Sequence, residues 1–193
     1  ISFVSKTFGF DTAVEEARKI IQCAHAESKG APYGVGLVKL MGRDSGYIAA
    51  HAALACPDAN FVLVPEEDFD LEGENGFLRT LERRLVSRGH AVVVVAEGAG
   101  QKFFEGMPKE TDASGNVKKG DIGLLLKDKI EEHCKARALA VNLKYIDPSY
   151  VIRSVAANAS DSIFCGLLAQ MAVHAGMSGK TDMLIGLWNN RYV

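Results

Sequence analysis

The sequence predicts an α/β protein, a three-layer αβα fold with a mostly parallel, Rossmann-like sheet. Segments with the apolar pattern of strands alternate with helical segments along the chain, as they do when helices cover both faces of a parallel sheet. The run from Ala91 to Ala96 is apolar at every position, which is typical of a central parallel strand buried on both faces. The 193 residues are enough for one sizeable core.

Helices are predicted from apolar residues that recur at helical spacing. Asp11 or Thr12 is a suitable N-cap for a helix over 11–28. A stripe of phenylalanine and leucine predicts another helix over 76–88. Residues 100–120 read as a loop with a turn at 112–116. The other predicted elements are, in chain order, strand 35–40, helix 46–55, strand 60–64, strand 91–96, helix 121–134, strand 138–144, helix 160–175 and strand 183–187.

Composition and charge exclude several classes of protein. The 22 basic and 24 acidic residues give a net charge of −2 and no basic stripe, which disfavours nucleic acid and anionic membranes as partners. The four cysteines and five histidines lack metal-ligand spacing, so we expect no metal site and no disulfide framework. No apolar run approaches the roughly 20 residues that span a bilayer, and the N-terminus lacks the pattern of a signal peptide. A cytoplasmic location is expected. The chain begins at Ile1 rather than Met, so we expect it to be a piece or a processed product of a longer protein.

The turn after strand 35–40 is a candidate anion site. It contains Gly42, Arg43 and Gly46 and leads directly into the helix predicted over 46–55. Backbone N–H groups at a helix N-terminus attract anions, and an arginine adds a bidentate grip on phosphate. An ordinary turn, in which the glycines relieve strain and Arg43 is solvated, would give the same pattern.

Polar side chains follow several predicted strands, and the carboxyl ends of parallel strands meet at one edge of the sheet. Arg43 follows the first strand, Glu97 follows strand 91–96, and Lys144, Tyr150 and Arg153 follow strand 138–144. Two arginines and a lysine suit a phosphate, whereas a carboxylate and a phenol suit hydroxyl groups. The set therefore indicates a sugar phosphate as ligand.

Glu66 also follows a predicted strand, but we expect it to have a structural role.

Several of these stretches resemble the 6-phosphofructokinase family, in particular its plant-type, trypanosomal and pyrophosphate-dependent branch. They occur in the order of the family and span nearly the whole chain. The matching stretches are Phe8–Ala13, Val38–Arg43 with Ser45-Gly46, Val64–Glu66, Val94–Gln101 and Lys144–Arg153.

The resemblance implies a fructose 6-phosphate site. Its substrate-binding residues would be Met41, Gly42, Arg43, Glu97, Lys144, Tyr150 and Arg153. Arg153 and Lys144 would offset phosphate charge, and Glu97 would accept a hydrogen bond from a sugar hydroxyl. Arg43 would also stabilise the transferring phosphoryl group in the transition state.

The resemblance also implies that essential parts lie outside these residues. The family's glycine-rich donor site and its Thr-Ile-Asp-Asn-Asp motif, which holds the general base, precede the stretch that begins at Phe8. We therefore expect no catalytic base and no Mg²⁺ ligand in this chain, and no turnover by the chain alone. The donor could be ATP or pyrophosphate. Residues 1–153 would form the fructose-6-phosphate-binding domain, and 154–193 a helix and strand that pack back onto the donor-binding domain. A homodimer or homotetramer is expected, although Tyr33 and Gly34 stand where some relatives supply a cation to a neighbouring subunit.

The function predicted for the parent protein is that of a 6-phosphofructokinase, which transfers a phosphoryl group to the 1-hydroxyl of fructose 6-phosphate in glycolysis. The alternative is a non-catalytic regulatory or assembly module derived from a phosphofructokinase half, which would have no need of Glu97, Tyr150 and Arg153. A generic nucleotide-binding domain is a third interpretation, but no G-x-G-x-x-G or G-K-[ST] turn follows a strand.

Overall fold

Four parallel strands form the central layer of the molecule, in the order β2-β3-β1-β4. The computed structural model describes residue 4 and residues 6–106 and 119–193. The strands are β1 (Gly34–Leu40), β2 (Phe61–Leu63), β3 (His90–Ala96) and β4 (Asn142–Ile146). The two central strands pair along their whole length, from Gly34 opposite His90 to Leu40 opposite Ala96.

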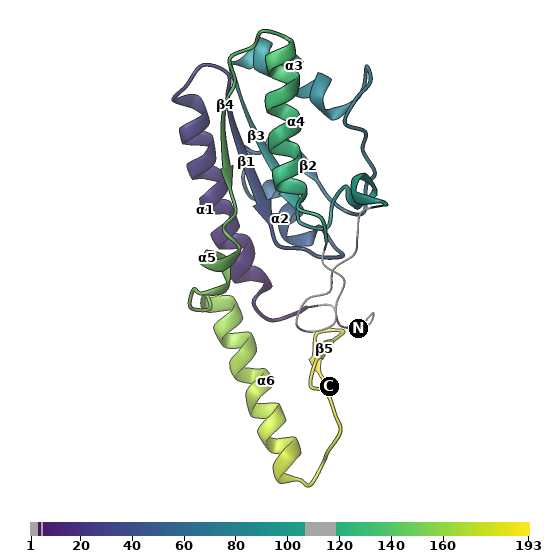
Figure 1. The fold of residues 1–193 in the computed structure, drawn as a ribbon. Coiled ribbons are helices and arrows are strands. Elements are labelled where there is room, and N and C mark those ends of the chain that lie inside the picture. The colour runs from purple at the N-terminus through teal and green to yellow at the C-terminus, as the bar shows by residue number, and fades with distance from the viewer. Residues whose placement is uncertain (1–3, 5, 107–118) are drawn as a thin grey trace.

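Helices cover both faces of this sheet (Figure 1). Successive valines of β3 alternate between two apolar cores, as expected from the period of two in a strand. The core that contains Val92 and Val94 packs against α1 (Phe10–Lys29), α2 (Tyr47–Leu54) and α5 (Ser149–Arg153). The core that contains Val93 and Val95 packs against α3 (Phe77–Arg88) and α4 (Ile122–Ala136). The predicted three-layer αβα fold with a parallel sheet is confirmed.

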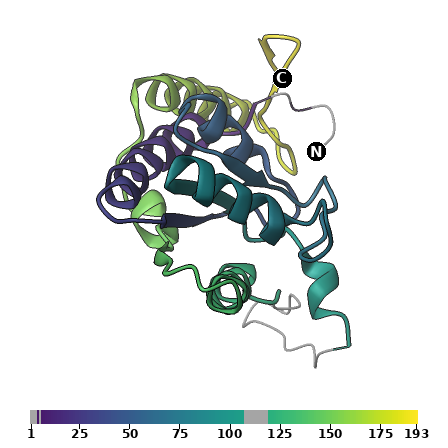
Figure 2. The same cartoon turned by 90° about the horizontal axis from the view of Figure 1, so that it is seen from above.

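The C-terminal segment extends beyond the sheet. It consists of α6 (Ala159–Met177) and a small hairpin of β5 (Leu187–Trp188) and β6 (Arg191–Tyr192). Seen from above, α6 lies beyond α1, away from α4 (Figure 2). No helix among the described residues is long and apolar enough to cross a bilayer.

A buried carboxylate joins α6 to the start of α1. Asp161 is completely buried; its Oδ1 accepts a hydrogen bond from the Gly9 N–H at 2.9 Å. Its Oδ2 accepts from the Thr12 N–H at 2.8 Å and from the Thr12 hydroxyl at 2.6 Å. These N–H groups lie at the N-terminus of α1, where the helix itself provides no hydrogen-bond acceptor for them. Asp161 therefore caps a helix that is distant in the sequence.

The structure corrects several predicted boundaries. The strand predicted at 138–144 is shifted to Asn142–Ile146, because residues 137–138 form the turn after α4, where Ala138 adopts a left-handed φ of 53°, and pairing with β1 begins at Asn142. The strand predicted at 183–187 is wrong, since β5 comprises Leu187 and Trp188 alone. The loop predicted at 100–120 contains a short 3₁₀ helix, η1 (Gln101–Phe104), and α5 was not predicted. The turn predicted at 112–116 lies outside the described residues.

We expect Asp161→Ala to detach α6 from α1. The change leaves two buried donors of Thr12 and the partly buried N–H of Gly9 without their acceptor, which should lower the free energy of unfolding by about 3 kcal/mol. Denaturant unfolding measures this loss, and limited proteolysis should show faster cleavage around α6. The exposed Asp128→Ala is the matched control and should change stability by less than about 0.5 kcal/mol. Coincident unfolding curves for Asp161→Ala and the unmodified protein would contradict the assignment.

Candidate functional site

Two turns lie side by side at the carboxyl edge of the sheet, one after β1 and one after β3. The backbone N–H of Glu97 donates to the carbonyl of Leu40 at 2.9 Å, and the N–H of Gly98 donates to the carbonyl of Gly42 at 3.1 Å. Gly42 has a φ of 147°, which favours glycine. At Gly98 an added Cβ would overlap the carbonyl oxygen of Arg43 and lie 2.8 Å from its carbon. The pairing thus places Arg43 and Glu97 in adjacent turns.

A cavity of about 260 Å³ opens at this edge. It is lined by Lys39, Arg43, Glu97, Lys119, Gly120, Asp121 and Ile122. Three cationic side chains and two carboxylates in so small a space suit a ligand that carries both an anionic group and hydroxyl groups. Of the predicted site residues, Arg43 and Glu97 line this cavity directly.

Lys39 is a cavity residue that the sequence analysis missed. It belongs to the strand that precedes the turn, and its Nζ lies 3.0 Å from Asp121 Oδ2 and 2.9 Å from Asp147 Oδ2. Burial acts to lower the pKa of Lys39, but the hydrogen bonds to Asp147 and Asp121 outweigh it, so the pKa is raised and the side chain stays protonated. A lysine within an otherwise buried strand, Val35–Leu40, was the signal that could have identified it.

Lys119 was also missed. Its ammonium donates to the backbone carbonyl of Arg43 and forms an ion pair of 2.6 Å with Asp44. The hydrogen bond from Lys119 holds the pKa of Asp44 below its ordinary value. Lys119 therefore connects the segment that leads into α4 with the turn that carries Arg43.

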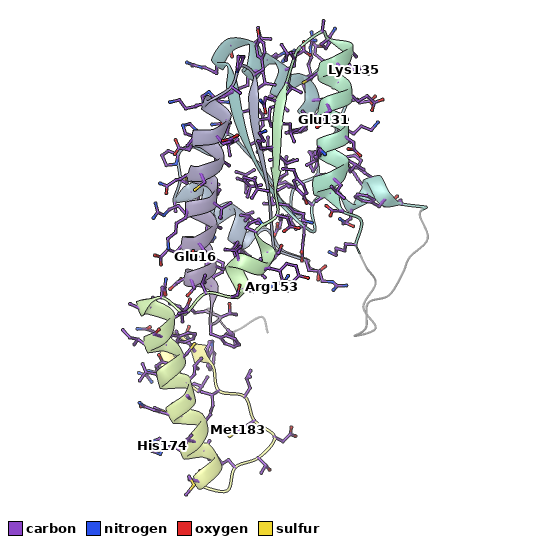
Figure 3. All side chains as sticks on the ribbon, turned by 60° about the vertical axis from the view of Figure 1, so that its left-hand side comes forward. Glu16, Glu131, Lys135, Arg153, His174 and Met183 are labelled. Carbon is purple, nitrogen blue, oxygen red and sulfur yellow. The ribbon has the colours of Figure 1, made fainter. Side chains whose placement is uncertain are left out.

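Tyr150 and Arg153 lie on α5, which follows β4 at the same edge of the sheet (Figure 3). The Arg153 guanidinium lies over the Tyr150 ring, 5.5 Å from its centre, and its Nε donates to the carbonyl of Ser149 at 3.1 Å. Both side chains are exposed, Tyr150 to 84%. The start of α5 is held by Asp147, whose Oδ1 accepts from the N–H and the hydroxyl of Ser149 at 3.2 and 2.5 Å. Burial acts to raise the pKa of Asp147, but the hydrogen bonds from Ser149 and Lys39 outweigh it and keep the pKa low.

Tyr150, Arg153 and Lys144 are not among the residues that line the cavity. Lys144 lies inside β4, opposite Gly36, rather than after the strand. Its neighbours Leu143 and Tyr145 pack against the core of α3 and α4, so Lys144 lies on the other face, where it is exposed.

A carboxylate of this chain already occupies the candidate anion site at the start of α2. The N–H of Gly46, the N-cap of α2, donates to both carboxylate oxygens of Glu66, at 2.9 and 3.0 Å. Glu66 thereby connects the end of β2 to α2, which confirms the structural role expected for it. The interpretation of this helix N-terminus as the phosphate site is not supported, because Glu66 puts negative charge there.

The described residues do not offer a site for a divalent metal ion. No group of three or more histidine, cysteine, aspartate and glutamate side chains within residues 6–106 and 119–193 could hold one. The cavity carboxylate Asp121 is engaged by Lys39 and by the first turn of α4. The resemblance implies Mg²⁺ ligands outside this chain, and no Mg²⁺ is assigned to the residues described.

Comparisons with known proteins agree with the resemblance seen in the sequence. The family model described as phosphofructokinase matches residues 1–176. The chain is 57% identical over 197 residues to an ATP-dependent 6-phosphofructokinase of Borreliella burgdorferi, covering 99% of this chain and 44% of the relative. It is 52% identical to ATP-dependent 6-phosphofructokinase 7 of Arabidopsis thaliana, with 99% of this chain and 40% of the relative covered. The chain thus spans less than half the length of these relatives.

The fold also matches a solved phosphofructokinase. The T-state crystal structure of Pichia pastoris phosphofructokinase superimposes with a TM-score of 0.65 at 20% identity, covering 98% of this chain and 20% of that chain. At this identity the likeness concerns the fold alone. The family model, which matches most of the chain, carries the assignment: the chain belongs to the phosphofructokinase family.

Proposed function

We propose that this chain is the sugar-phosphate-binding part of a 6-phosphofructokinase, which transfers a phosphoryl group to the 1-hydroxyl of fructose 6-phosphate in glycolysis. The observation that carries the proposal is the cavity in which Arg43 and Glu97 lie on adjacent strand ends. Their charges suit a ligand with a phosphate at one end and hydroxyl groups at the other.

Each candidate residue has a role that follows from its chemistry. Arg153, an exposed guanidinium beside Tyr150, would bind the sugar phosphate. Glu97 would accept a hydrogen bond from a sugar hydroxyl. Arg43 would bind the substrate and offset the charge that spreads over the phosphoryl oxygens in the transition state. Met41 and Gly42 would shape the floor of the site, since Met41 packs against the core beneath the turn.

The donor and the general base would come from the part of the parent protein outside this chain. The names of the relatives from Borreliella burgdorferi and Arabidopsis thaliana support ATP as the donor. Mg²⁺ would accompany the nucleotide, with ligands outside the described residues. The parent would act in the cytoplasm.

The remaining predictions concern assembly. Lys144 faces away from the cavity, so we do not assign it a contact with the sugar phosphate. The parent would form a homodimer or homotetramer, as the resemblance implies. Residues 154–193 would pack onto the donor-binding domain, since Ile163, Val173 and Met177 of α6 are 67%, 63% and 84% exposed. Water is an unfavourable surrounding for so much apolar surface.

We expect the complete protein to bind fructose 6-phosphate through the two arginines. Arg43→Ala and Arg153→Ala should each weaken binding at least about tenfold, because a hydrogen bond to a charged group contributes about 1.5–3 kcal/mol. Isothermal titration calorimetry measures the dissociation constants. Arg83→Ala, on the exposed surface of α3, is the control and should bind as the unmodified protein does. Unchanged affinity in both test variants would refute the site.

Gly98→Ala should damage the same site through the backbone. The new methyl group would overlap the carbonyl of Arg43, so one of the two paired turns must move. A misplacement of about 1 Å can cost roughly 10²-fold in rate, and we expect a loss of that order in kcat/KM. Ser87→Ala, on the exposed surface of α3, is the control, and activity should persist. Full activity in Gly98→Ala would show that activity does not depend on the close approach of the two turns.

The 193-residue chain alone should not catalyse phosphoryl transfer, because catalysis needs donor, metal and base positioned together. A coupled assay for fructose 1,6-bisphosphate, with ATP and then with pyrophosphate, tests this. The complete protein in the same assay is the positive control. Turnover by the isolated chain would mean that its own residues supply a base and a donor site.

A further inference from the structure

Lys39 is a charged side chain inside a buried strand. The residues on either side of it, Val38 and Leu40, are completely buried, and the Lys39 side chain is only 12% exposed. A charge in such a place must be paired to be tolerated. Its partners are Asp121 at 3.0 Å and Asp147 at 2.9 Å, from two segments that are distant in the sequence.

Each of these carboxylates also binds the start of a helix: Asp121 is the N-cap of α4, and Asp147 binds the first residue of α5. Asp121 Oδ1 accepts from the N–H groups of Gly123 and Leu124, at 3.0 and 3.2 Å, at the start of α4. Asp147 Oδ1 accepts from Ser149 at the start of α5. In both residues the second oxygen, Oδ2, faces the Lys39 ammonium. One ammonium thus joins the N-termini of two helices to the strand that leads to Arg43.

The charges argue against a direct contact between Lys39 and the substrate phosphate. Two carboxylates surround one ammonium, so the cluster has a net charge of −1 and would repel an anion. The Tyr145 ring, with its centre 5.9 Å from Nζ, covers a further side of the ammonium. A phosphate at Lys39 would therefore compete with Asp121 and Asp147, whose oxygens lie within 3.0 Å of the ammonium.

We propose that Lys39 is a positioning residue of the sugar-phosphate site, which holds the starts of α4 and α5 in place relative to the turn that carries Arg43. This inference rests on the proposed function. The start of α4 borders the cavity through Asp121 and Ile122, and α5 carries Tyr150 and Arg153. Removing the ammonium leaves two carboxylates facing each other, which should repel one another and move α5 away from Arg43.

The test is Lys39→Met in the complete protein, since methionine has a similar length and no charge. We expect the KM for fructose 6-phosphate to rise roughly tenfold or more. The KM for the phosphoryl donor should change by less than about twofold, because Lys39 and its two carboxylates belong to the proposed sugar-phosphate site and not to the donor site. Lys129→Met is the matched control, since Lys129 pairs with Glu132 on the exposed side of α4, and its KM values should not change.

A double-mutant cycle with Asp147→Asn separates positioning from a general loss of stability. If the two residues act through one contact, Lys39→Met should add little to the effect of Asp147→Asn on the KM for fructose 6-phosphate. An unchanged KM in Lys39→Met, equal rises for both substrates, or multiplicative effects in the double variant would each overturn the proposal.

Two further measurements keep the outcome decisive. Arg153→Ala in the same assay tests the proposed function itself. If Arg153→Ala and Arg43→Ala both leave the KM for fructose 6-phosphate unchanged, the proposed site fails. An effect of Arg153→Ala without one of Lys39→Met refutes the positioning role alone. If Lys39→Met does not fold, Asp147→Asn carries the test, since it keeps the shape of the side chain. A selective rise in the KM for fructose 6-phosphate then supports the proposal, and no rise overturns it.

Discussion

The parallel pairing of β1 with β3 is the constraint on which the rest of the site depends. The two strands remain in register to their last residues, Leu40 and Ala96, and two further backbone hydrogen bonds continue the pairing into the turns. The turns can approach this closely because Gly98 has no side chain. A guanidinium and a carboxylate from segments more than fifty residues apart thereby line the same small cavity.

The cations of the candidate site differ in burial, and their surroundings differ accordingly. Lys39 is nearly buried and has two carboxylates within 3.0 Å, one at the start of α4 and one beside the start of α5. Arg153 is exposed at the surface of α5, against the Tyr150 ring, where an incoming phosphate can reach it. Lys119 combines features of both, since it lines the cavity and also donates to the carbonyl of Arg43. Residue type alone therefore does not show whether a charged side chain binds the substrate or stabilises the structure around the site.

The C-terminal helix α6 is anchored at one end but has exposed apolar residues along its length. α6 is anchored at its start by the buried Asp161, which satisfies donors at the beginning of α1. Along the rest of the helix, Phe164 is buried but Ile163, Val173 and Met177 are exposed. Such an arrangement anchors one end of the helix and leaves part of its apolar surface exposed. It agrees with a chain that spans less than half the length of its relatives.

Much of the fold could be predicted from the sequence, because the relevant signals are local. The apolar stripe of α3 and the unbroken apolar run of β3 specify type and burial without reference to any other segment. The motifs around Arg43 and Glu97 were recognisable for the same reason.

The tertiary structure alone decided what depends on the meeting of distant segments. The left-handed turn at Ala138 moved β4 along the chain and put Lys144 on the face opposite the cavity. Glu66 occupies the start of α2, and Lys39 has its two partners, only because separate strands end at the same edge. Periodicity in a sequence reports which residues are buried, whereas the pairing of charges depends on distances that exist only once the chain has folded.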